Sequence, residues 1–375
     1  MADKTIEMLS VSPGQVIAIW ASTHSLDLVE ALAVRIRARG AFWTLRLTME
    51  SLLRRIGQSV PEPYLASVPE HELRWLADVS AIVEVRDHGG HILEVPLVRR
   101  RALAAEWIAL IDEARRRGCR RIQVVNPTPA LASAYGVPVE DLRQSYWRAV
   151  NVDYAALDRQ QDRVAARLAR ARLVHVASAL GTDLHLRIDD RPVHQDTDSL
   201  PRGEVYVAPH EDSAEGVAVI DRAFVAGKPI ERLRLVFRKG RVVDASAADP
   251  SAAHLFRELL SASAGDKDVI AELAIGLNPG AAEPIGDVML DEKIAGSCHI
   301  AIGMNTHFGG RNQSNLHLDL VMLRPTVRTD GEVFVDNGAT LPSTPFSERI
   351  GERATRTGGR HEPDSHSNRE SHARF

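Results

Sequence analysis

The apolar positions follow one pattern up to about residue 178 and a different pattern after it. In the first part, short apolar runs alternate with segments whose apolar residues recur at helical spacing. Strands are predicted at residues 15–20, 41–47, 79–85 and 120–126, and helices at 25–40 and 100–118. Because strands interleaved with helices pair mainly in parallel, residues 1–178 are predicted to form an α/β domain with a mainly parallel sheet.

The second part of the chain is predicted to be rich in β-structure. Residues 151–178 are rich in Arg and Ala and predict one long helix, after which the apolar runs become short, alternating and separated by turn residues. We expect a β-rich (α+β) domain over residues 179–345, interrupted by a helix at 251–263. Residues 346–375 have little apolar content and no period, which predicts a disordered tail.

Composition excludes several classes of partner. Charged residues make up 26% of the chain and the formal net charge is -4, so a nucleic-acid partner is not expected. No run reaches the roughly 18–20 apolar residues of a membrane span, so we expect a cytoplasmic protein without membrane contact. The two cysteines, Cys119 and Cys298, are far apart and form no CxxC pair. A metal in this chain would therefore be bound through nitrogen and oxygen atoms.

One short segment concentrates side chains that bind metals. Residues 297–320 contain His299, His307 and His317, with Asp319 two positions after the last histidine. In a strand, residues i and i+2 project to the same face, so His317 and Asp319 would point together. A glycine-rich hairpin between residues 303 and 312 would bring His299 beside them. Such a set suits zinc, cobalt, manganese or ferrous iron, although each histidine taken alone also fits a structural role.

From Gly181 onward the chain resembles the metallo-aminopeptidase family of the leucyl aminopeptidase and aminopeptidase T type. The resemblance rests on six segments in the family's order: GTDLHLRI (181–188), LPRGEVYVAP (200–209), ELAIGLNP (272–279), DEKIAGSCHIAIG (291–303), GGRNQSNLHLD (309–319) and DGEVFVDNG (330–338). The first half of the chain is similar to the family only in its α/β character.

The resemblance implies a metal-dependent hydrolase that cleaves an amide bond of a small molecule or short peptide with metal-bound hydroxide. Matched position by position, it implies that the metal ligands are Glu204, Glu272, His299, His317 and Asp319. Glu204 and Glu272 are also the candidate catalytic carboxylates, one of which would act as general base. The family further implies one or two divalent ions and a homodimer.

The chain departs from the family's pattern at one ligand. The family has a tyrosine several residues after the equivalent of His299, in a longer loop, whereas this chain has no tyrosine after Tyr206. His307 lies in the corresponding loop and is a candidate replacement ligand. Without a replacement, we expect the site to hold a single ion.

Two other functions fit the same residues. A set of two histidines and one carboxylate also serves mononuclear non-haem iron oxygenases, and the chain is similar to the 2,5-dihydroxypyridine dioxygenases, which cleave an aromatic ring. A relative that keeps the fold and the metal but performs no catalysis is the third possibility. Lys293 and Arg311 flank the metal segment. They could neutralise an anionic group of the substrate or an oxyanion, but exposed surface positions are the favoured expectation.

Overall fold

The first part of the chain forms a five-stranded parallel sheet. The computed structural model describes residues 1–87, 95–225 and 228–341. The strand order is β2-β1-β3-β4-β8, and every neighbouring pair is parallel. The strands are β1 (Val16–Ser22), β2 (Phe42–Thr48), β3 (Ala81–Arg86), β4 (Arg120–Val125) and β8 (Ser199–Leu200). The short strand β8 comes from the second part of the chain, so this sheet uses residues on both sides of position 178.

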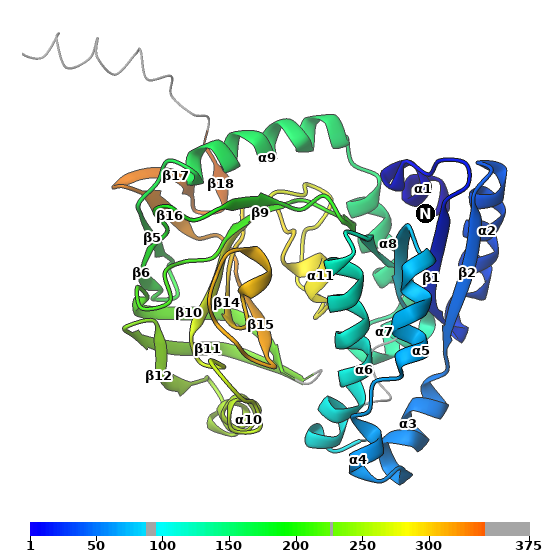
Figure 1. The fold of residues 1–375 in the computed structure, drawn as a ribbon. Coiled ribbons are helices and arrows are strands. Elements are labelled where there is room, and N and C mark those ends of the chain that lie inside the picture. Colours follow the sequence, from blue (N-terminus) through cyan, green and yellow to red (C-terminus); the bar gives the residue numbers. More distant parts are fainter. Residues whose placement is uncertain (88–94, 226–227, 342–375) are drawn as a thin grey trace, which may run out of the picture. The chain divides into compact units, whose positions relative to one another are not determined.

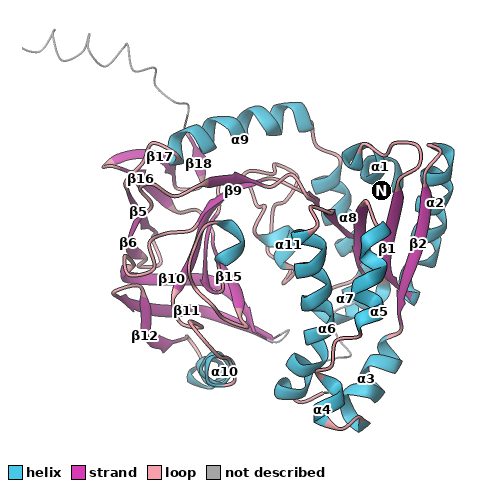
Figure 2. Ribbon diagram, in the orientation of Figure 1, coloured by secondary structure: helices cyan, strands magenta, loops and turns pink. Residues whose placement is uncertain are grey.

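Helices cover both faces of this sheet (Figure 1; Figure 2). Alternate residues of β1 point to opposite sides: Ile17 and Ile19 pack with α1 and α2, whereas Ala18 and Trp20 pack with α6. The helices of this part are α1 (Ala2–Leu9), α2 (Leu26–Ala38), α3 (Glu50–Ser59), α4 (Glu62–Leu65), α5 (Glu70–Trp75), α6 (Leu97–Arg116), α7 (Pro129–Tyr135), α8 (Val139–Val150) and α9 (Tyr154–Leu168). The predicted α/β organisation, with a parallel sheet between layers of helices, is confirmed.

The second part of the chain is built on two antiparallel sheets that share one hydrophobic core. The larger has the order β12-β11-β10-β6-β5-β16-β17-β18. Its strands are β5 (Leu173–Ala177), β6 (Asp183–Arg187), β10 (Glu215–Val225), β11 (Lys228–Arg238), β12 (Arg241–Ser246), β16 (Thr326–Thr329), β17 (Glu332–Asp336) and β18 (Ala339–Thr340). Strand β6 alternates exposed and buried residues, as expected for a sheet with one face on the core and one in water.

The smaller antiparallel sheet has the order β15-β14-β13-β9-β7. Its strands are β7 (Val193–Gln195), β9 (Glu204–Val207), β13 (Ile270–Gly276), β14 (Cys298–Gly303) and β15 (His317–Met322). Its central strand β13 is buried along its whole length, and Leu273 joins the core shared with the larger sheet. Two helices accompany these sheets, α10 (Pro250–Ser261) and α11 (Val288–Asp291). The predicted hairpin is present, because β14 and β15 pair directly.

One prediction about secondary structure was wrong. The segment 151–178 was expected to be a single helix, but α9 ends at Leu168 and residues Leu173–Ala177 form strand β5. The helical period is replaced after Leu168 by alternation, in which Val174 and Val176 are buried in the core. Burial of these two β-branched residues favours a strand over continuation of the helix.

Residues 1–341 form one compact unit. None of the described helices is long and apolar enough to cross a membrane. The predicted disordered tail, with His361, His366 and His372, lies outside the described residues.

Candidate metal centre

The five predicted ligands lie on four neighbouring strands of the smaller antiparallel sheet. His317 and Asp319 are on β15, His299 on β14, Glu272 on β13 and Glu204 on β9. Glu272 is paired with Ala301 and Ala301 with Asp319, so these three positions form one row across the sheet. His299 and His317 are each two residues from this row, and Glu204 is paired with Gly276, four residues after Glu272, so all five side chains project from the same face.

The five side chains approach one another closely. Nε2 of His299 lies 3.4 Å from Oε2 of Glu204 and 3.6 Å from Oε1 of Glu272. Nε2 of His317 lies 3.4 Å from Oε2 of Glu272 and 3.1 Å from Oδ1 of Asp319. Two ligand groups result, Glu204 with Glu272 and His299, and Glu272 with His317 and Asp319, each with its ligand atoms within 4.8 Å of one another. Since Glu272 belongs to both groups, the arrangement suits two adjacent ions bridged by one carboxylate.

The backbone holds the ring of His317 in one orientation. The Nδ1 atom of His317 lies 2.7 Å from the carbonyl oxygen of Met304, the first residue of the loop after β14. A hydrogen bond from Nδ1–H to this carbonyl fixes the orientation of the ring and directs Nε2 at the carboxylates, where this nitrogen can bind a cation in place of its proton. The imidazole is therefore prepared to bind a cation through Nε2.

Polar atoms without hydrogen bonds show that the residues fit a metal. Among the described residues, Oε2 of Glu204 and both ring nitrogens of His299 are buried and have no hydrogen-bond partner. The side chain of His299 has no exposed surface at all. Leaving such atoms unsatisfied costs about 1–3 kcal/mol each, and more for charged groups. A divalent ion between Glu204 and His299 would satisfy atoms that the protein alone does not.

The pKa values of the site reflect a local balance of buried charges. Burial lowers the pKa of His299, but contact with Glu272 and the charge of Glu204 outweigh it and raise the pKa to about 9. Burial raises the pKa of Asp319, but the charge of His317 and its hydrogen bond lower it to about 2. Burial keeps the pKa of Glu204 well above its ordinary value. The carboxylates thus favour a positive charge on the histidines that lie between them.

Lys293 is not the exposed surface residue that was predicted. It is buried, and its Nζ donates hydrogen bonds of 2.6 Å to Oε1 of Glu204 and 2.6 Å to Oε1 of Glu292. The same Nζ lies 3.0 Å from Oδ2 of Asp196. The amine offsets part of the charge of three carboxylates. It holds Oε1 of Glu204, whereas Oε2 of the same carboxylate faces His299. Arg311, by contrast, is exposed as predicted.

Sequence reasoning missed Glu292 and Asp196. Glu292 forms a third ligand group with His299 and Asp319. It lies in the quoted segment DEKIAGSCHIAIG, so its place beside Lys293 in a family motif was an available signal. Asp196, which is buried against Lys293, follows strand β7 in a segment without a comparable motif. Only the fold brings Asp196 to the site.

A cavity of about 250 Å³ opens onto the ligands. Its walls include the aromatic rings of Tyr206 and Phe308, which meet edge to face with their centroids 5.5 Å apart. Gln123 of β4 contributes from the parallel sheet. The remaining lining residues are Asp196, Asp198, Ser199, Glu204, Glu272, Met289, Glu292, Lys293, His317 and Asp319. This volume is below the range of about 300–1,000 Å³ typical of pockets for drug-sized ligands, so the cavity suits a small group.

His307 lies apart from the ligand groups. It belongs to a short 3-10 helix, Thr306–Phe308, and its Nδ1 is 2.6 Å from Nη1 of Arg115 on α6. Burial and the charge of Arg115 lower the pKa of His307. The neighbouring Phe308 packs edge to face on the ring of His317, with centroids 6.0 Å apart. In this loop, Phe308 rather than His307 contacts a predicted ligand.

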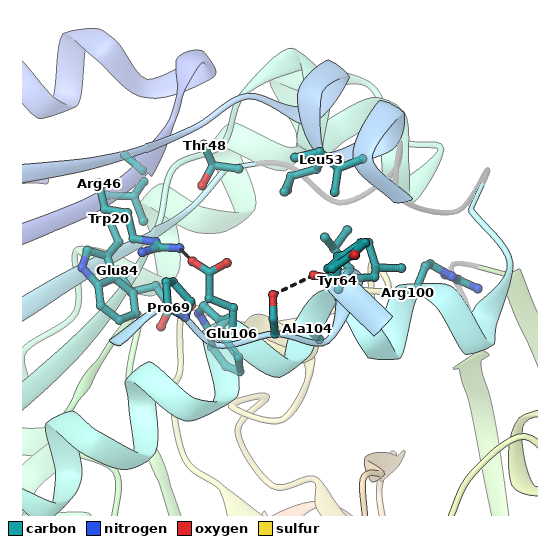
Figure 3. Close-up of a pocket in the computed structure, with 17 residues that line it drawn as sticks. Trp20, Arg46, Thr48, Leu53, Tyr64, Pro69, Glu84, Arg100, Ala104 and Glu106 are labelled. Atoms are coloured by element: carbon teal, nitrogen blue, oxygen red, sulfur yellow. Dashed lines mark hydrogen bonds and ion pairs between the residues drawn. The ribbon is translucent and has the colours of Figure 1, made fainter. Parts of the chain in front are cut away.

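A second cavity lies in the first part of the chain and has a different character (Figure 3). It has a volume of about 500 Å³ and is bordered by Trp20, Tyr64 and Trp107. Figure 3 shows the guanidinium of Arg46 beside the carboxylate of Glu106, and the two form an ion pair. Among the described residues that line this cavity there is no histidine or cysteine. Of these two cavities, the first is therefore the one lined by metal-binding side chains.

A metal-dependent enzyme with ligands on a β-sheet is the class of protein that this fold and this site indicate. The chain belongs to the thermophilic metalloprotease (M29) family, whose model matches residues 5–340. It is 25% identical over 396 residues to aminopeptidase T of Thermus aquaticus, covering 89% of this chain and 93% of that protein. The membership makes the chain an enzyme with a divalent-metal cofactor.

Two solved structures share the fold. Wild-type AmpT from Thermus thermophilus has a TM-score of 0.75 and 22% identity, covering 91% of this chain and 98% of the other. The 2,5-dihydroxypyridine dioxygenase from Pseudomonas putida has a TM-score of 0.61 and 16% identity, covering 91% and 96%. The fold is thus shared by AmpT and by a dioxygenase, and the chemistry has to be argued from the site.

Proposed function

We propose that the protein is a metal-dependent aminopeptidase that cleaves an amide bond of a short peptide or small aminoacyl substrate. The observation that carries the proposal is the buried set of ligands, in which Glu204 and His299 keep atoms without hydrogen bonds. Family membership over residues 5–340 and the similarity to aminopeptidase T support it. The small cavity supports a small substrate.

The proposed ligands are the five residues predicted from the sequence, Glu204, Glu272, His299, His317 and Asp319. These residues would hold one or two divalent ions, which would supply Lewis acidity to polarise the amide carbonyl and to activate water near neutral pH. Lys293 fixes Oε1 of Glu204 and leaves Oε2 for the ion. Met304 accepts the hydrogen bond of His317 and keeps Nε2 of that ring available. His307 stays a candidate ligand that would have to leave Arg115 to reach an ion.

We further propose that Glu292 accepts the proton from the attacking water. The sequence assigned this role to Glu204 or Glu272, but the present proposal uses both of these carboxylates as metal ligands. Glu292 also lies near His299 and Asp319, but it is not among the five proposed ligands. Glu292 lines the cavity, and Lys293 holds its Oε1 at 2.6 Å. A carboxylate that is anchored at one oxygen is well placed to take up a proton at the other and deliver it to the leaving amine.

The first part of the chain has a proposed role in shaping the cavity. Gln123 reaches the cavity from β4. The division into an α/β domain at 1–178 and a catalytic domain at 179–345 stays a prediction. A homodimer and a cytoplasmic location stay predictions. Light scattering of the purified protein tests the first of these.

A ring-cleaving iron dioxygenase is the second candidate. The site contains two histidines and a carboxylate, and the tyrosine ligand of the peptidases is missing from its loop. The additional carboxylates Glu204 and Glu272 favour the peptidase. With Glu272 shared between the two ligand groups, the site has enough ligands for two ions.

Metal analysis distinguishes the two candidates. Zinc, cobalt or manganese bound to the purified protein, together with hydrolysis of aminoacyl amides, is expected for the aminopeptidase. One oxygen-sensitive ferrous ion, with uptake of dioxygen on a hydroxylated aromatic compound, would instead establish the dioxygenase. The H317A/D319A double variant should lose the metal of this centre and hydrolysis, whereas H254A, at an exposed histidine on α10, should keep both. Full activity of the double variant would overturn both candidates.

A further inference from the structure

A second cluster of metal-binding side chains lies on the larger antiparallel sheet. His175 of β5 is directly opposite His185 of β6, and Asp183 is two residues before His185 on the same strand. Strands β5 and β6 are neighbours in this sheet (Figure 1). The burial of β6 alternates, so Asp183 and His185 both project from its exposed face. The cluster is separate from the candidate metal centre, whose ligands are on the other antiparallel sheet.

The ligand atoms of this cluster converge on one carboxylate oxygen. Nε2 of His175 is 2.7 Å from Oδ1 of Asp183, and Nε2 of His185 is 3.5 Å from the same oxygen. The two imidazole rings are parallel within 3°, with centroids 4.2 Å apart. One ligand atom from each of the three residues lies within 4.8 Å of the others. In a tetrahedral zinc site, bonds of about 2.1 Å place two ligand atoms about 3.4 Å apart. The corresponding distances from Oδ1 of Asp183 are 2.7 Å to His175 and 3.5 Å to His185.

Two of the three side chains have room to adjust to an ion. Relative exposure is 62% for His185 and 72% for Asp183, whereas His175, at 29%, is held in part by its neighbours. The backbone positions need not change, because the pairing of β5 with β6 already fixes the histidines opposite each other. Two imidazoles and one carboxylate leave a fourth position open to water.

Charged neighbours surround the cluster on both sides. Glu215 of β10 is paired with His185, and Arg328 of β16 is paired with His175, so the row carries one acidic and one basic neighbour. Oε1 of Glu215 accepts a hydrogen bond of 2.7 Å from the backbone N–H of Lys239. Arg187, two residues after His185, pairs with Asp189 at 3.1 Å. The charges of these neighbours largely offset one another, so the cluster itself determines the affinity for a cation.

We propose that His175, Asp183 and His185 form a second metal site, which binds zinc or a similar nitrogen-preferring dication such as nickel or copper. The ion replaces the hydrogen bond between His175 and Asp183 and links β5 to β6 across the sheet. Hard ions such as magnesium, which prefer oxygen ligands, do not bind there. The site is independent of the catalytic proposal and shares no residue with it.

Zinc stoichiometry tests the second site. The full-length protein and its variants are dialysed against the same micromolar free zinc, and bound metal is measured by mass spectrometry. The wild type should bind one more zinc per chain than H185N or H175N. H254N is the matched control, because His254 pairs with Glu258 at 3.2 Å on α10 and has no second imidazole beside it among the described residues. The histidines at 361, 366 and 372 are present in every protein and cancel in the comparison.

Activity separates this proposal from the catalytic one. Hydrolysis of an aminoacyl amide by H185N and H175N should equal that of the wild type, since the catalytic ligands are unchanged. Equal zinc binding by the wild type, H185N and H175N would overturn the second site and leave the aminopeptidase proposal intact. Loss of zinc from H254N to the same extent would also overturn it, because the effect would then not be specific to the cluster.

Discussion

A buried lysine connects the metal ligands to the carboxylates behind them. Lys293 contacts Asp196, Glu204 and Glu292, and all four side chains are buried. Burial lowers the pKa of this amine, but the charges of Asp196 and Glu204 outweigh it and raise the pKa well above its ordinary value. Lys293 therefore stays charged and makes the close packing of the carboxylates possible.

Removal of this amine should destabilise the protein. In K293M three carboxylates lose their common cation, and breaking such a buried pair typically costs about 3–5 kcal/mol of unfolding free energy. Denaturant unfolding measures this loss, and metal analysis should show weaker binding because Glu204 is no longer fixed. In the control K267M, the lost hydrogen bond runs from a partly exposed amine to the carbonyl of Ser263, so the change should stay below about 1 kcal/mol. Equal stability of K293M and the wild type would contradict this role.

At the scale of single residues, the sequence predicted what lies on a motif and missed what depends on burial. His299, His317 and Asp319 could be found because short spacing on paired strands brings them together. Lys293 was wrongly predicted to be exposed, because lysine side chains are exposed in most proteins. Its burial depends on contact with Asp196, which is distant in the sequence. No local pattern encodes that contact.

The hairpin of β14 and β15 depends on a glycine at its turn. Gly303 has φ of 107° and is paired with His317. A Cβ atom there would lie 2.1 Å from the carbonyl oxygen of Leu316, which accepts the hydrogen bond of Met304 N at 2.7 Å. Both the backbone conformation and the space therefore require glycine.

Substitution of this glycine should disturb the hairpin and the metal centre together. G303A should lose about 2 kcal/mol or more of unfolding free energy, because strain at positive φ adds to a backbone clash. Thermal unfolding measures the loss, and metal content should fall because His317 is displaced. Gly331 is the matched control: its φ is 86°, but an added Cβ would meet nothing within 4 Å. If G331A lost as much stability and metal as G303A, the clash would not be the cause.

At the scale of elements, periodicity predicted most strands and helices of the first part and the hairpin of the second. The boundary at α9 and β5 was missed, because Arg- and Ala-rich residues favour a helix until the core buries Val174 and Val176. The assignment of Glu204, on β9, and Glu272, on β13, as ligands came from resemblance. Strand order in an antiparallel sheet is set by contacts between distant segments, which no single-segment pattern contains.

The reactivity of the two cysteines depends on whether the whole molecule is folded. Burial raises the pKa of Cys119 to about 11 and raises the pKa of Cys298 further, since Cys298 lies within β14 and has no exposed surface. The thiolate is the reactive form, and a raised pKa reduces it at neutral pH. Both thiols should therefore react slowly while the protein is folded.

Alkylation at different pH values checks this expectation. With a pKa of about 11, about one Cys119 thiol in 1,000 is ionised at pH 8, and each pH unit below 11 changes that fraction about tenfold. The rate of reaction of Cys119 with iodoacetamide should thus rise about tenfold from pH 8 to pH 9. Cys298 should react only after unfolding in denaturant. Peptide mass spectrometry measures both, and rapid labelling of Cys298 in the folded protein would contradict the structure.

The strand order of the smaller sheet bears on how this enzyme could diversify. Four adjacent strands of this sheet each contribute at least one ligand. Phe308, which lines the cavity, instead belongs to the loop between β14 and β15, outside the sheet. Insertions or replacements in the loop would remodel what enters the cavity and leave the inorganic chemistry in place. Substrate preference and metal chemistry are thereby free to evolve on different segments of the chain, at different rates.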